Sequence, residues 1–398
     1  MSQPTIVSAS CASRLLLGAQ GLLDTPQRTA SKTSLLELIQ RLGFVQIDSI
    51  NVVARAHDLT LLSRLDGYKP EQLDHLFCAQ RRLFEHWTHD ASFVPTEWYA
   101  QWKPRFRRDR DLITRNRWWQ QRVGAQADAI LDHVRARITA EGALKSSDFE
   151  HEGPREAWWG WKPAKAALDL LWRTGELAIV RRDGFQKVYD LAERVLPEAC
   201  GQPEPDPQDH LQWACASAAE RLVVFTPSEL AGFWDCVDLP AARQWCAQGA
   251  KLGTLEPVVV HNADGTRPQS AFALADWQSR AEKLVEPVRR IRLLSPFDPV
   301  LRDRDRCLRR FGFDYRFEAF VPSDKRQYGY YALPILEGDN LIGRLDAKTH
   351  RNKGQLEVRG LWWENGVAAG KRRLQNLRSA LERLAAFVGA NDLTGPGT

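Results

Sequence analysis

The chain has 398 residues, of which 43% are hydrophobic and 26% charged, as expected of a globular protein with about two to four domains. No apolar run approaches the ~18 residues that span a bilayer, and the N-terminal sequence lacks the basic and apolar regions of a secretory signal. The seven cysteines include no C-x-x-C pair, which argues against a disulfide framework or a zinc ribbon and favours the cytoplasm.

The order helix, helix, β-hairpin recurs along the chain, and its first copy is the least regular. Ser34–Glu37 has the spacing of a capping box, and the apolar periodicity that follows predicts a helix ending at Gly43. Its apolar face is formed by Leu35, Leu38, Ile39 and Leu42. The next segments are predicted as extended (44–50), helical (52–65 and 73–80) and extended again (81–87).

A basic segment follows between Gln101 and Arg122, where eight basic residues oppose Asp109 and Asp111, a local charge of +6 in a chain whose net charge is +5. The interleaved aromatic residues are Trp102, Phe106, Trp118 and Trp119. Basic side chains neutralise phosphates and aromatic rings stack on bases, so this segment is a candidate nucleic-acid surface. A solvated helix face with a few anchoring aromatics has the same pattern. A second basic cluster, residues 302–316, contains six Arg and three Asp.

The middle copy of the repeat is the clearest. A helix begins at Pro163 and ends before Gly175, a residue suited to a left-handed C-cap. Its apolar face is formed by Ala164, Ala167, Leu168, Leu171 and Trp172. Strands 176–180 and 185–189 then flank a turn at Asp183-Gly184. The basic residues near the tip are Arg181, Arg182 and Lys187. A helix followed by a basic hairpin is typical of a winged helix, although an α+β unit without a ligand looks similar locally.

The third copy follows a Pro-rich acidic linker, 197–210. Thr226–Glu229 forms a capping box, residues 240–252 read as a helix, and strands 256–261 and 270–275 bracket a turn. Beyond about residue 291 the predicted elements are strands 315–321, 328–336, 341–347 and 355–363 and an amphipathic helix, 369–388. They indicate a small antiparallel sheet or barrel, and residues 389–398 are expected to fray.

Two short groups of side chains could carry chemistry, and no P-loop, dinucleotide fingerprint or G-x-S-x-G elbow is present. In an extended segment Gln46 and Asp48 project to one face while Ile47 packs behind them. Such a carboxylate could stabilise positive charge on a deoxyribose and accept a proton from the attacking water, while the amide holds the water or the sugar. Asp48 could equally cap the helix that follows it.

The second group is His86, His89 and Asp90. Two histidines three residues apart with a carboxylate could bind a metal or act as a general base. A further ligand at suitable spacing is missing, and Trp87 favours a packed structural turn. No metal and no cofactor are therefore expected.

The chain resembles the YcaQ/AlkZ-type winged-helix DNA glycosylases in motifs spread over nearly its whole length. These are Gln46–Asp48, Asn51–His57, Glu85–Ala91, Trp158–Pro163, Leu294–Pro299, Lys325–Tyr331, Leu333–Leu336 and Gly343–Lys348. The resemblance implies an α+β fold in which tandem winged helices form a concave DNA-binding surface and the C-terminal region forms an antiparallel β-barrel. The domain boundaries that we expect are 1–122, 123–200, 208–290 and 291–398.

The Gln-apolar-Asp form of the motif is similar to the YcaQ branch, whereas the AlkZ branch has Gln at the last position. That branch implies a monofunctional enzyme that removes N7-alkylguanine and unhooks interstrand crosslinks, with Gln46 and Asp48 catalytic. We expect a monomer that binds double-stranded DNA and no membrane. The residues expected to contact DNA are Arg55, Lys103, Arg105, Arg107, Arg108, Lys162, Lys165, Arg181, Arg182, Lys325 and Arg326.

Two other functions fit parts of the pattern. A non-catalytic winged-helix regulator would share the wings and the basic segment but would need nothing from Gln46 or Asp48. A metal-dependent nuclease would instead depend on His86, His89 and Asp90, and a chelator would abolish its activity.

Overall fold

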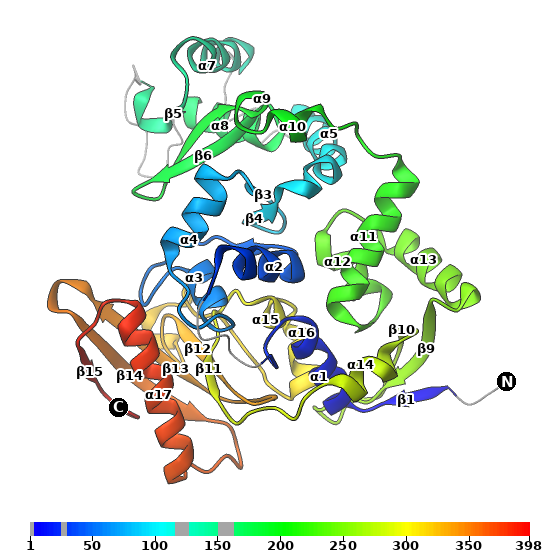
Figure 1. Cartoon of the computed structure of the whole chain (residues 1–398), viewed down its shortest axis with the longest axis vertical. Helices are drawn as coiled ribbons and strands as arrows, with labels where there is room; N and C mark the ends of the chain where they lie inside the picture. The colour runs from blue at the N-terminus through cyan, green and yellow to red at the C-terminus, as the bar shows by residue number, and fades with distance from the viewer. Residues whose placement is uncertain (1–3, 25–29, 116–126, 150–162) are drawn as a thin grey trace. The chain divides into compact units, whose positions relative to one another are not determined.

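The computed structural model describes residues 4–24, 30–115, 127–149 and 163–398 (Figure 1). The chain forms two compact units: unit 1 combines Met1–Pro70 with Gln212–Thr398, and unit 2 is Glu71–Leu211. The four domain boundaries expected from the sequence stay a prediction, because one compact unit can contain more than one winged-helix module.

Unit 1 begins with β1 (Thr5–Val7), α1 (Ala9–Ala19) and α2 (Lys32–Leu42), followed by β2 (Val45–Gln46) and α3 (Ala56–Leu62). The predicted apolar face of α2 is buried along its length. The capping box, however, is formed by Ser31 and Ser34, one turn earlier than the expected Ser34 and Glu37. Helix α3 is also shorter than the predicted 52–65, because residues before Ala56 bond to the C-terminal sheet instead of to each other.

The third predicted hairpin is confirmed and belongs to a four-stranded sheet of order β1-β9-β10-β8. Strands β9 (Leu255–Val260) and β10 (Gln269–Leu274) pair antiparallel, and β8 is Val224–Phe225. Strand β1, which the sequence pattern does not reveal, pairs parallel with β9. The helices of this region are α12 (Pro227–Trp234), α13 (Leu239–Leu252) and α14 (Trp277–Lys283). The capping box of Thr226 and Glu229 is present as predicted, and α13 ends in a left-handed C-cap at Gly253.

The C-terminal part of unit 1 is an open five-stranded sheet of order β11-β12-β13-β14-β15, so the expected closed antiparallel barrel is wrong. Its strands are β11 (Ile291–Leu293), β12 (Ala332–Glu337), β13 (Asn340–His350), β14 (Gln355–Trp363) and β15 (Asp392–Thr394). The edge strands β11 and β15 have only three residues each, and β15 pairs parallel with β14. Residues 392–394 therefore extend the sheet where fraying was expected.

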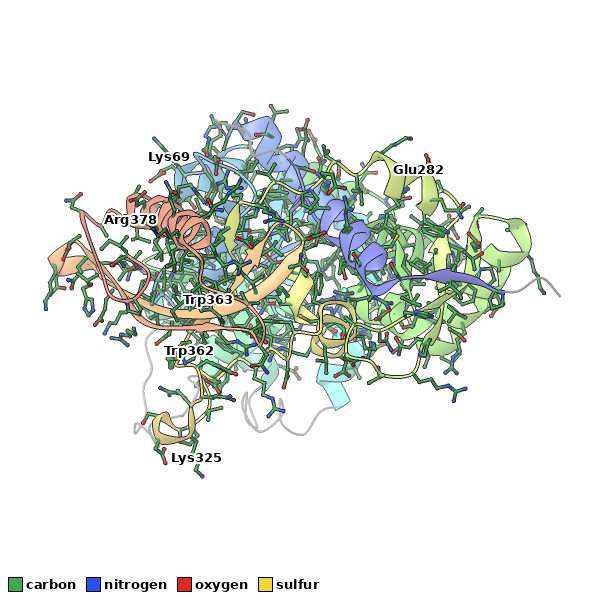
Figure 2. The ribbon with its side chains drawn as sticks, turned by 90° about the horizontal axis from the view of Figure 1, so that it is seen from below. Lys69, Glu282, Lys325, Trp362, Trp363 and Arg378 are labelled. Carbon is green, nitrogen blue, oxygen red and sulfur yellow. The ribbon has the colours of Figure 1, made fainter. Side chains whose placement is uncertain are left out.

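A loop replaces one of the predicted barrel strands, 315–321. Helices α15 (Pro299–Arg302) and α16 (Arg304–Phe311) precede it, and residues 312–331 contain no strand. The Glu318 carboxylate accepts hydrogen bonds from the backbone N–H groups of Gln327 (3.0 Å) and Tyr328 (2.7 Å), which a neighbouring strand would otherwise have bonded. Figure 2 shows Lys325 near the end of this projecting loop.

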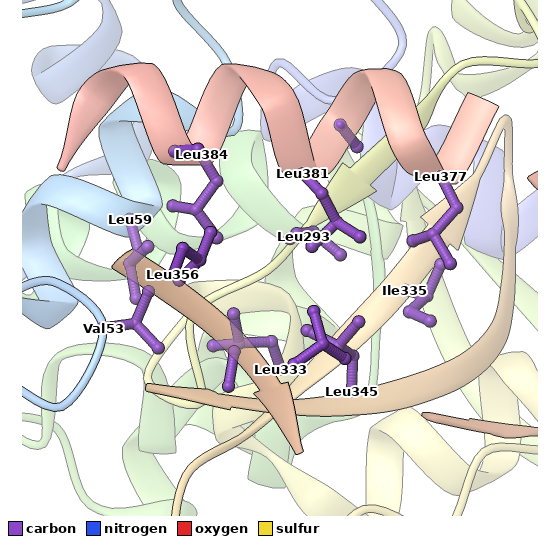
Figure 3. Close-up of a cluster of buried hydrophobic side chains, with 14 of the residues drawn as sticks. Val53, Leu59, Leu293, Leu333, Ile335, Leu345, Leu356, Leu377, Leu381 and Leu384 are labelled. Atoms are coloured by element: carbon purple, nitrogen blue, oxygen red, sulfur yellow. The ribbon is translucent and has the colours of Figure 1, made fainter. Parts of the chain in front are cut away.

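Helix α17 (Lys371–Phe387) covers the sheet and supplies the reason that it stays open. Leu377, Leu381 and Leu384 pack against strand residues such as Leu333 and Leu345 (Figure 3). The helix fills the concave face with apolar side chains, so the two sheet edges need not meet to bury the core. The predicted helix 369–388 agrees closely with these bounds.

Unit 2 contains two β-hairpins and several helices. Its early elements are α4 (from Pro70 to Asp74), a π-helix (His75–Ala79), β3 (Leu83–Trp87), β4 (Ala91–Pro95) and α5 (Tyr99–Arg115). The later elements are α7 (Ala127–Glu141), β5 (Leu144–Lys145), α8 (Pro163–Arg173), β6 (Leu177–Asp183), β7 (Gln186–Leu191), α9 (Ala192–Val195), α10 (Pro197–Gly201) and the start of α11 (Pro207–Leu222), whose residues from Gln212 onward belong to unit 1. The last two show that the linker expected at 197–210 is mostly helical, because Pro197 and Pro207 begin helices instead of interrupting them.

The middle winged-helix pattern is present in unit 2 as helix α8 followed by the hairpin β6–β7. Gly175 has a positive φ of 77°, as its predicted C-cap position requires. The turn lies one residue later than expected: Asp183 pairs with Gln186, and the positive-φ residues are Gly184 and Phe185.

A buried ion pair joins distant parts of unit 1. Arg64 donates to both carboxylate oxygens of Asp298, at 2.6 and 3.0 Å, and both side chains are almost inaccessible to solvent. The same carboxylate accepts from the backbone N–H of Val300 (3.1 Å) at the start of α15. Asp298 belongs to the Leu294–Pro299 motif, so this part of the resemblance has a structural role.

Replacing Asp298 with alanine should lower the free energy of unfolding by about 3–5 kcal/mol, because the substitution leaves the Arg64 guanidinium buried without its counter-ion. Urea denaturation measures the loss. Glu382→Ala, which breaks the exposed pair with Arg378, is the control and should cost less than about 1 kcal/mol. Equal losses of unfolding free energy in the two variants would show that the buried Arg64–Asp298 pair contributes no more to stability than the exposed pair.

Candidate active site

The segment that holds Gln46 and Asp48 is fixed at its start by a glycine and an aromatic ring. Gly43 ends α2 with a φ of 92°, and a Cβ there would come within 2.7 Å of Arg221 Nε. The next residue, Phe44, is buried with its ring centroid 5.9 Å from that of Phe233 and 5.8 Å from that of Trp234. Only glycine therefore allows the chain to turn from α2 into the candidate site.

Burial alternates along this segment as expected for extended backbone. Val45 and Ile47 are buried, whereas Gln46 and Asp48 are partly exposed. This pattern is consistent with the predicted placement of the amide and the carboxylate on one face. The regular strand β2 itself ends at Gln46.

Asp48 caps a turn and does not cap helix α3. Its Oδ1 accepts a hydrogen bond from the backbone N–H of Ile50 at 2.7 Å, an Asx-type turn that orients the carboxylate. The N-cap residue of α3 is Arg55, which makes no side-chain capping bond. The alternative role of Asp48 as a helix cap is therefore wrong.

Residues 51–53, directly after the Asp48 turn, are bonded to the end of β13. The backbone N–H of Thr349 donates to Val52 O (2.9 Å), and its hydroxyl donates to Val53 O (3.0 Å). Arg351 donates to the backbone and side-chain oxygens of Asn51, at 3.0 and 2.6 Å. These bonds hold the turn on the C-terminal sheet. The sequence analysis did not single out Thr349 or Arg351.

Tyr331 carries a buried hydroxyl that is affected by the charge of Asp48, and Ser295 lies near that hydroxyl. The sequence patterns single out neither residue. Tyr331 is completely buried just before β12, and Ser295 is buried in the Leu294–Pro299 motif. Burial raises the pKa of Tyr331, the negative charge of Asp48 raises it further, and the Ser295 hydroxyl lowers it. The site thus joins residues near positions 48, 295 and 331, which no local sequence pattern connects.

Comparison with known proteins identifies the family. The sequence matches the family "DNA glycosylase AlkZ-like" over residues 39–387, most of the chain. The chain belongs to the AlkZ-like DNA glycosylase family. Its fold is similar to that of the Streptomyces sahachiroi DNA glycosylase AlkZ, with a TM-score of 0.65 and 15% sequence identity over 98% of this chain and 99% of the other. Family membership implies DNA as the substrate and an N-glycosylase as the enzyme class.

The residues expected to contact DNA differ in exposure. Those exposed are Arg107, Arg108, Lys165, Arg181 and Lys325, and those partly buried are Arg55, Lys103, Arg182 and Arg326. Arg105 is only 5% exposed and donates to Thr88 O at 3.2 Å, so its guanidinium lies inside unit 2 and is unsuited to a phosphate contact. Lys162 lies outside the described residues.

Some of these cations also have partners within their own unit. Arg182 pairs with the buried Glu85 carboxylate at 2.6 Å, and Lys103 donates to Cys200 O at 2.8 Å. Arg107 remains well exposed while pairing with Glu204 at 2.9 Å. In this AlkZ-like chain the outer residues of α5 are therefore better placed for phosphates than the inner ones.

The aromatic residues of the basic segment do not form the expected stacking surface where they are described. Trp102 and Phe106 are buried, and Phe106 contacts the imidazole of His86 with ring centroids 4.8 Å apart. They are core residues because one face of the amphipathic helix α5 packs into unit 2. Trp118 and Trp119 lie outside the described residues. In the second basic cluster, Arg306 and Arg310 are buried. Arg302 is partly buried, and desolvation lowers its pKa to about 9.

The histidine group is a packed turn. His86 is buried, its Nε2 lies 3.0 Å from Trp172 O, and burial lowers its pKa to about 3. No cluster of metal-ligating side chains occurs among the described residues. The interpretation of His86 as structural is the one that the AlkZ-like fold supports. None of the described helices is long and apolar enough to cross a membrane.

The buried His86 should make stability fall in mild acid. Its folded pKa of about 3 is below the ordinary 6.5, so the unfolded chain binds a proton that the folded chain excludes as the pH drops below 6.5. Between pH 7.5 and pH 5 this group alone should cost about 2 kcal/mol of unfolding free energy. Denaturant titrations of the wild type and of His86→Gln, which cannot titrate, measure the difference. Identical pH dependence in both proteins would contradict the assignment.

Proposed function

We propose that this chain is a monofunctional DNA glycosylase that hydrolyses the N-glycosidic bond of N7-alkylguanine and unhooks interstrand crosslinks formed through that position. One observation carries the proposal: the family match spans a segment in which Gln46 and Asp48 are partly exposed on either side of the buried Ile47. The acidic third position of the motif favours the YcaQ branch, with its broader substrate range.

The chemistry assigned to Asp48 needs only a fixed carboxylate. The bond between C1′ of the deoxyribose and N9 of the guanine breaks, and the bonding electrons neutralise the cationic alkylated base as it leaves. Asp48 stabilises the positive charge that develops on the sugar and accepts a proton from water as the water oxygen bonds to C1′. Gln46 orients the water or the sugar. The products are a free alkylguanine and an abasic site.

N7-alkylation explains why no strong general acid is required. The leaving base already carries a positive charge, so its departure yields a neutral molecule without protonation. The hydrogen bond from Ile50 N–H to Asp48 Oδ1 is consistent with this mechanism, because a hydrogen bond donated to a carboxylate favours its ionised form. A base without N7 substitution should react far more slowly.

A crosslinked base cannot rotate freely out of the duplex, so the enzyme must act at an open site. Asp48 is partly exposed, in keeping with this requirement. A cavity of about 710 Å³ in unit 1 is bordered by residues such as Arg289, Glu337 and Arg373 and includes neither Gln46 nor Asp48. The proposed chemistry does not use this cavity.

The loop of residues 312–331 is suited to probe the duplex. Phe320, at 89% exposure, presents its ring to solvent, and Lys325 and Arg326 follow in the same loop. The Phe320 ring contacts the ring of Phe317 in the same loop, with centroids 6.1 Å apart. An apolar ring beside cations can enter between stacked bases while the cations neutralise phosphates.

Asp48→Asn should reduce abasic-site formation on an N7-methylguanine duplex by more than ~30-fold, a loss of about 2 kcal/mol of transition-state stabilisation, because the amide cannot stabilise the sugar cation. The assay is incubation in EDTA followed by alkaline cleavage of the strand. A duplex with a defined N7–N7 crosslink tests unhooking in the same way.

The control for this variant is Asp128→Asn, which makes the same change at an exposed position of α7. It should leave the rate unchanged. An Asp48→Asn enzyme that folds normally and retains the wild-type rate would exclude the proposed role. Strand cleavage that EDTA abolishes would instead support a nuclease.

The exposed cations of α5 should determine part of the salt dependence of binding. Replacing both Arg107 and Arg108 with Gln should reduce the slope of log affinity against log salt concentration by about 2, since each phosphate contact contributes roughly 0.9. Fluorescence anisotropy with an undamaged duplex measures this slope.

Phe320→Ala serves as the comparison, because it removes an uncharged contact. It should weaken binding to the duplex and leave the salt slope as in the wild type. An unchanged slope in the Arg107 and Arg108 double variant would show that these cations do not bind phosphates.

A further inference from the structure

Tyr331 carries a buried hydroxyl that the fold itself does not use. The residue is completely buried, and its ring packs edge-on against Phe317 with centroids 5.8 Å apart. Its backbone N–H donates to Asp346 Oδ1 at 3.4 Å. Among the described residues, however, the hydroxyl oxygen has no hydrogen-bond partner of acceptable geometry.

Other buried tyrosines of unit 1 show what a structural hydroxyl does. Tyr315 donates to Ala332 O, and Tyr68 donates to Asp58 Oδ1, each at 2.8 Å. A buried polar group without such a bond destabilises the fold by about 1–3 kcal/mol. Phenylalanine at position 331 would keep the ring packing and avoid this cost, so packing alone does not account for the tyrosine.

The Tyr331 side chain shares a hydrophobic cluster with residues that follow Asp48 in the chain. Tyr331 belongs to the same buried cluster as Val53 and Ala54, and Ile50 packs against that cluster. The Asp48 carboxylate is close enough for its charge to raise the pKa of Tyr331, after the larger effect of burial. Ser295 is also close and lowers that pKa, although its hydroxyl does not reach good hydrogen-bonding geometry with Tyr331.

The charged groups facing this position are few. Asp48 approaches from the segment after β2, and Asp346 approaches from β13 through the Tyr331 backbone. Burial raises the pKa of Asp346, while Arg359 and Arg326 lower it. Of these two carboxylates, that of Asp48 is the one whose charge acts on the Tyr331 hydroxyl.

We propose that Tyr331 is a positioning residue whose hydroxyl donates a hydrogen bond to the Asp48 carboxylate when DNA is bound. This inference rests on the proposed glycosylase function of Asp48. The bond would hold the carboxylate ionised and aimed at the attacking water, together with the bond that Ile50 N–H already donates. A donor from a buried side chain keeps this orientation without competing with water.

Loss of the Tyr331 hydroxyl should shift the pH dependence of kcat in a direction that loss of packing alone would not produce. A hydrogen bond donated to a carboxylate lowers its pKa, so loss of the donor raises the pKa of Asp48. In Tyr331→Phe the acid limb of the kcat–pH profile should move upward by about one pH unit. At neutral pH kcat should fall about tenfold, with a smaller change in KM.

The test compares Tyr331→Phe with Tyr315→Phe on the N7-methylguanine duplex from about pH 4.5 to pH 8. Tyr315 is equally buried, but its hydroxyl bonds to the backbone, so its loss should lower stability and leave the acid limb unchanged. A Tyr331→Phe enzyme with wild-type kcat and acid limb overturns the inference, while an impaired Asp48→Asn enzyme still upholds the proposed function.

A second measurement does not depend on turnover. Carbon-13 NMR can follow the Asp48 carboxyl titration in complex with a duplex whose N7-methylguanosine is 2′-fluorinated to resist hydrolysis. The apparent pKa should be higher in Tyr331→Phe than in the wild type. An unchanged titration overturns the role of Tyr331 whatever the activity. A wild-type chain that forms no abasic sites overturns the glycosylase proposal and, with it, this inference.

Discussion

The bonds between residues 51–53 and the end of β13 are the constraint on which the candidate site depends. Thr349 and Arg351 supply donors to backbone oxygens of a segment about 300 positions earlier in the chain. Without them the turn at Asp48 would connect a two-residue strand to a short helix with little to define its path. The C-terminal sheet is therefore part of the scaffold of the candidate site as well as a layer of the core.

The buried polar groups of unit 1 differ in whether their hydrogen-bonding capacity is satisfied. The Arg64–Asp298 pair is closed on itself and contributes to structure, because both charges are satisfied away from solvent. The hydroxyl of Tyr331 is incompletely satisfied and lies beside the residue to which we assign the chemistry. Unused hydrogen-bonding capacity in a core is commonly retained for function.

A run of basic residues in the sequence does not by itself identify a basic surface. Residues of the basic segment divide between the outer face of α5, where Arg107 and Arg108 are exposed, and its inner face, where Arg105 and Trp102 are buried. Likewise, Arg306 and Arg310 of the second basic cluster are buried in unit 1. Amphipathic packing, and not the local sum of charges, decides which cations can meet a phosphate.

Local sequence patterns predicted several helices, two caps and the exposure of two candidate site residues. Apolar periodicity placed α2, α8, α13 and α17, the caps at Thr226 and Gly175 were visible as residue patterns, and alternation predicted the exposure of Gln46 and Asp48. Tertiary structure alone decided the open C-terminal sheet, the parallel pairing of β1 with β9, and the meeting of Asp48 with Tyr331 and Ser295. Caps and periodicity act over a few residues, whereas sheet edges and buried hydroxyls are defined by segments that approach only after the chain has folded.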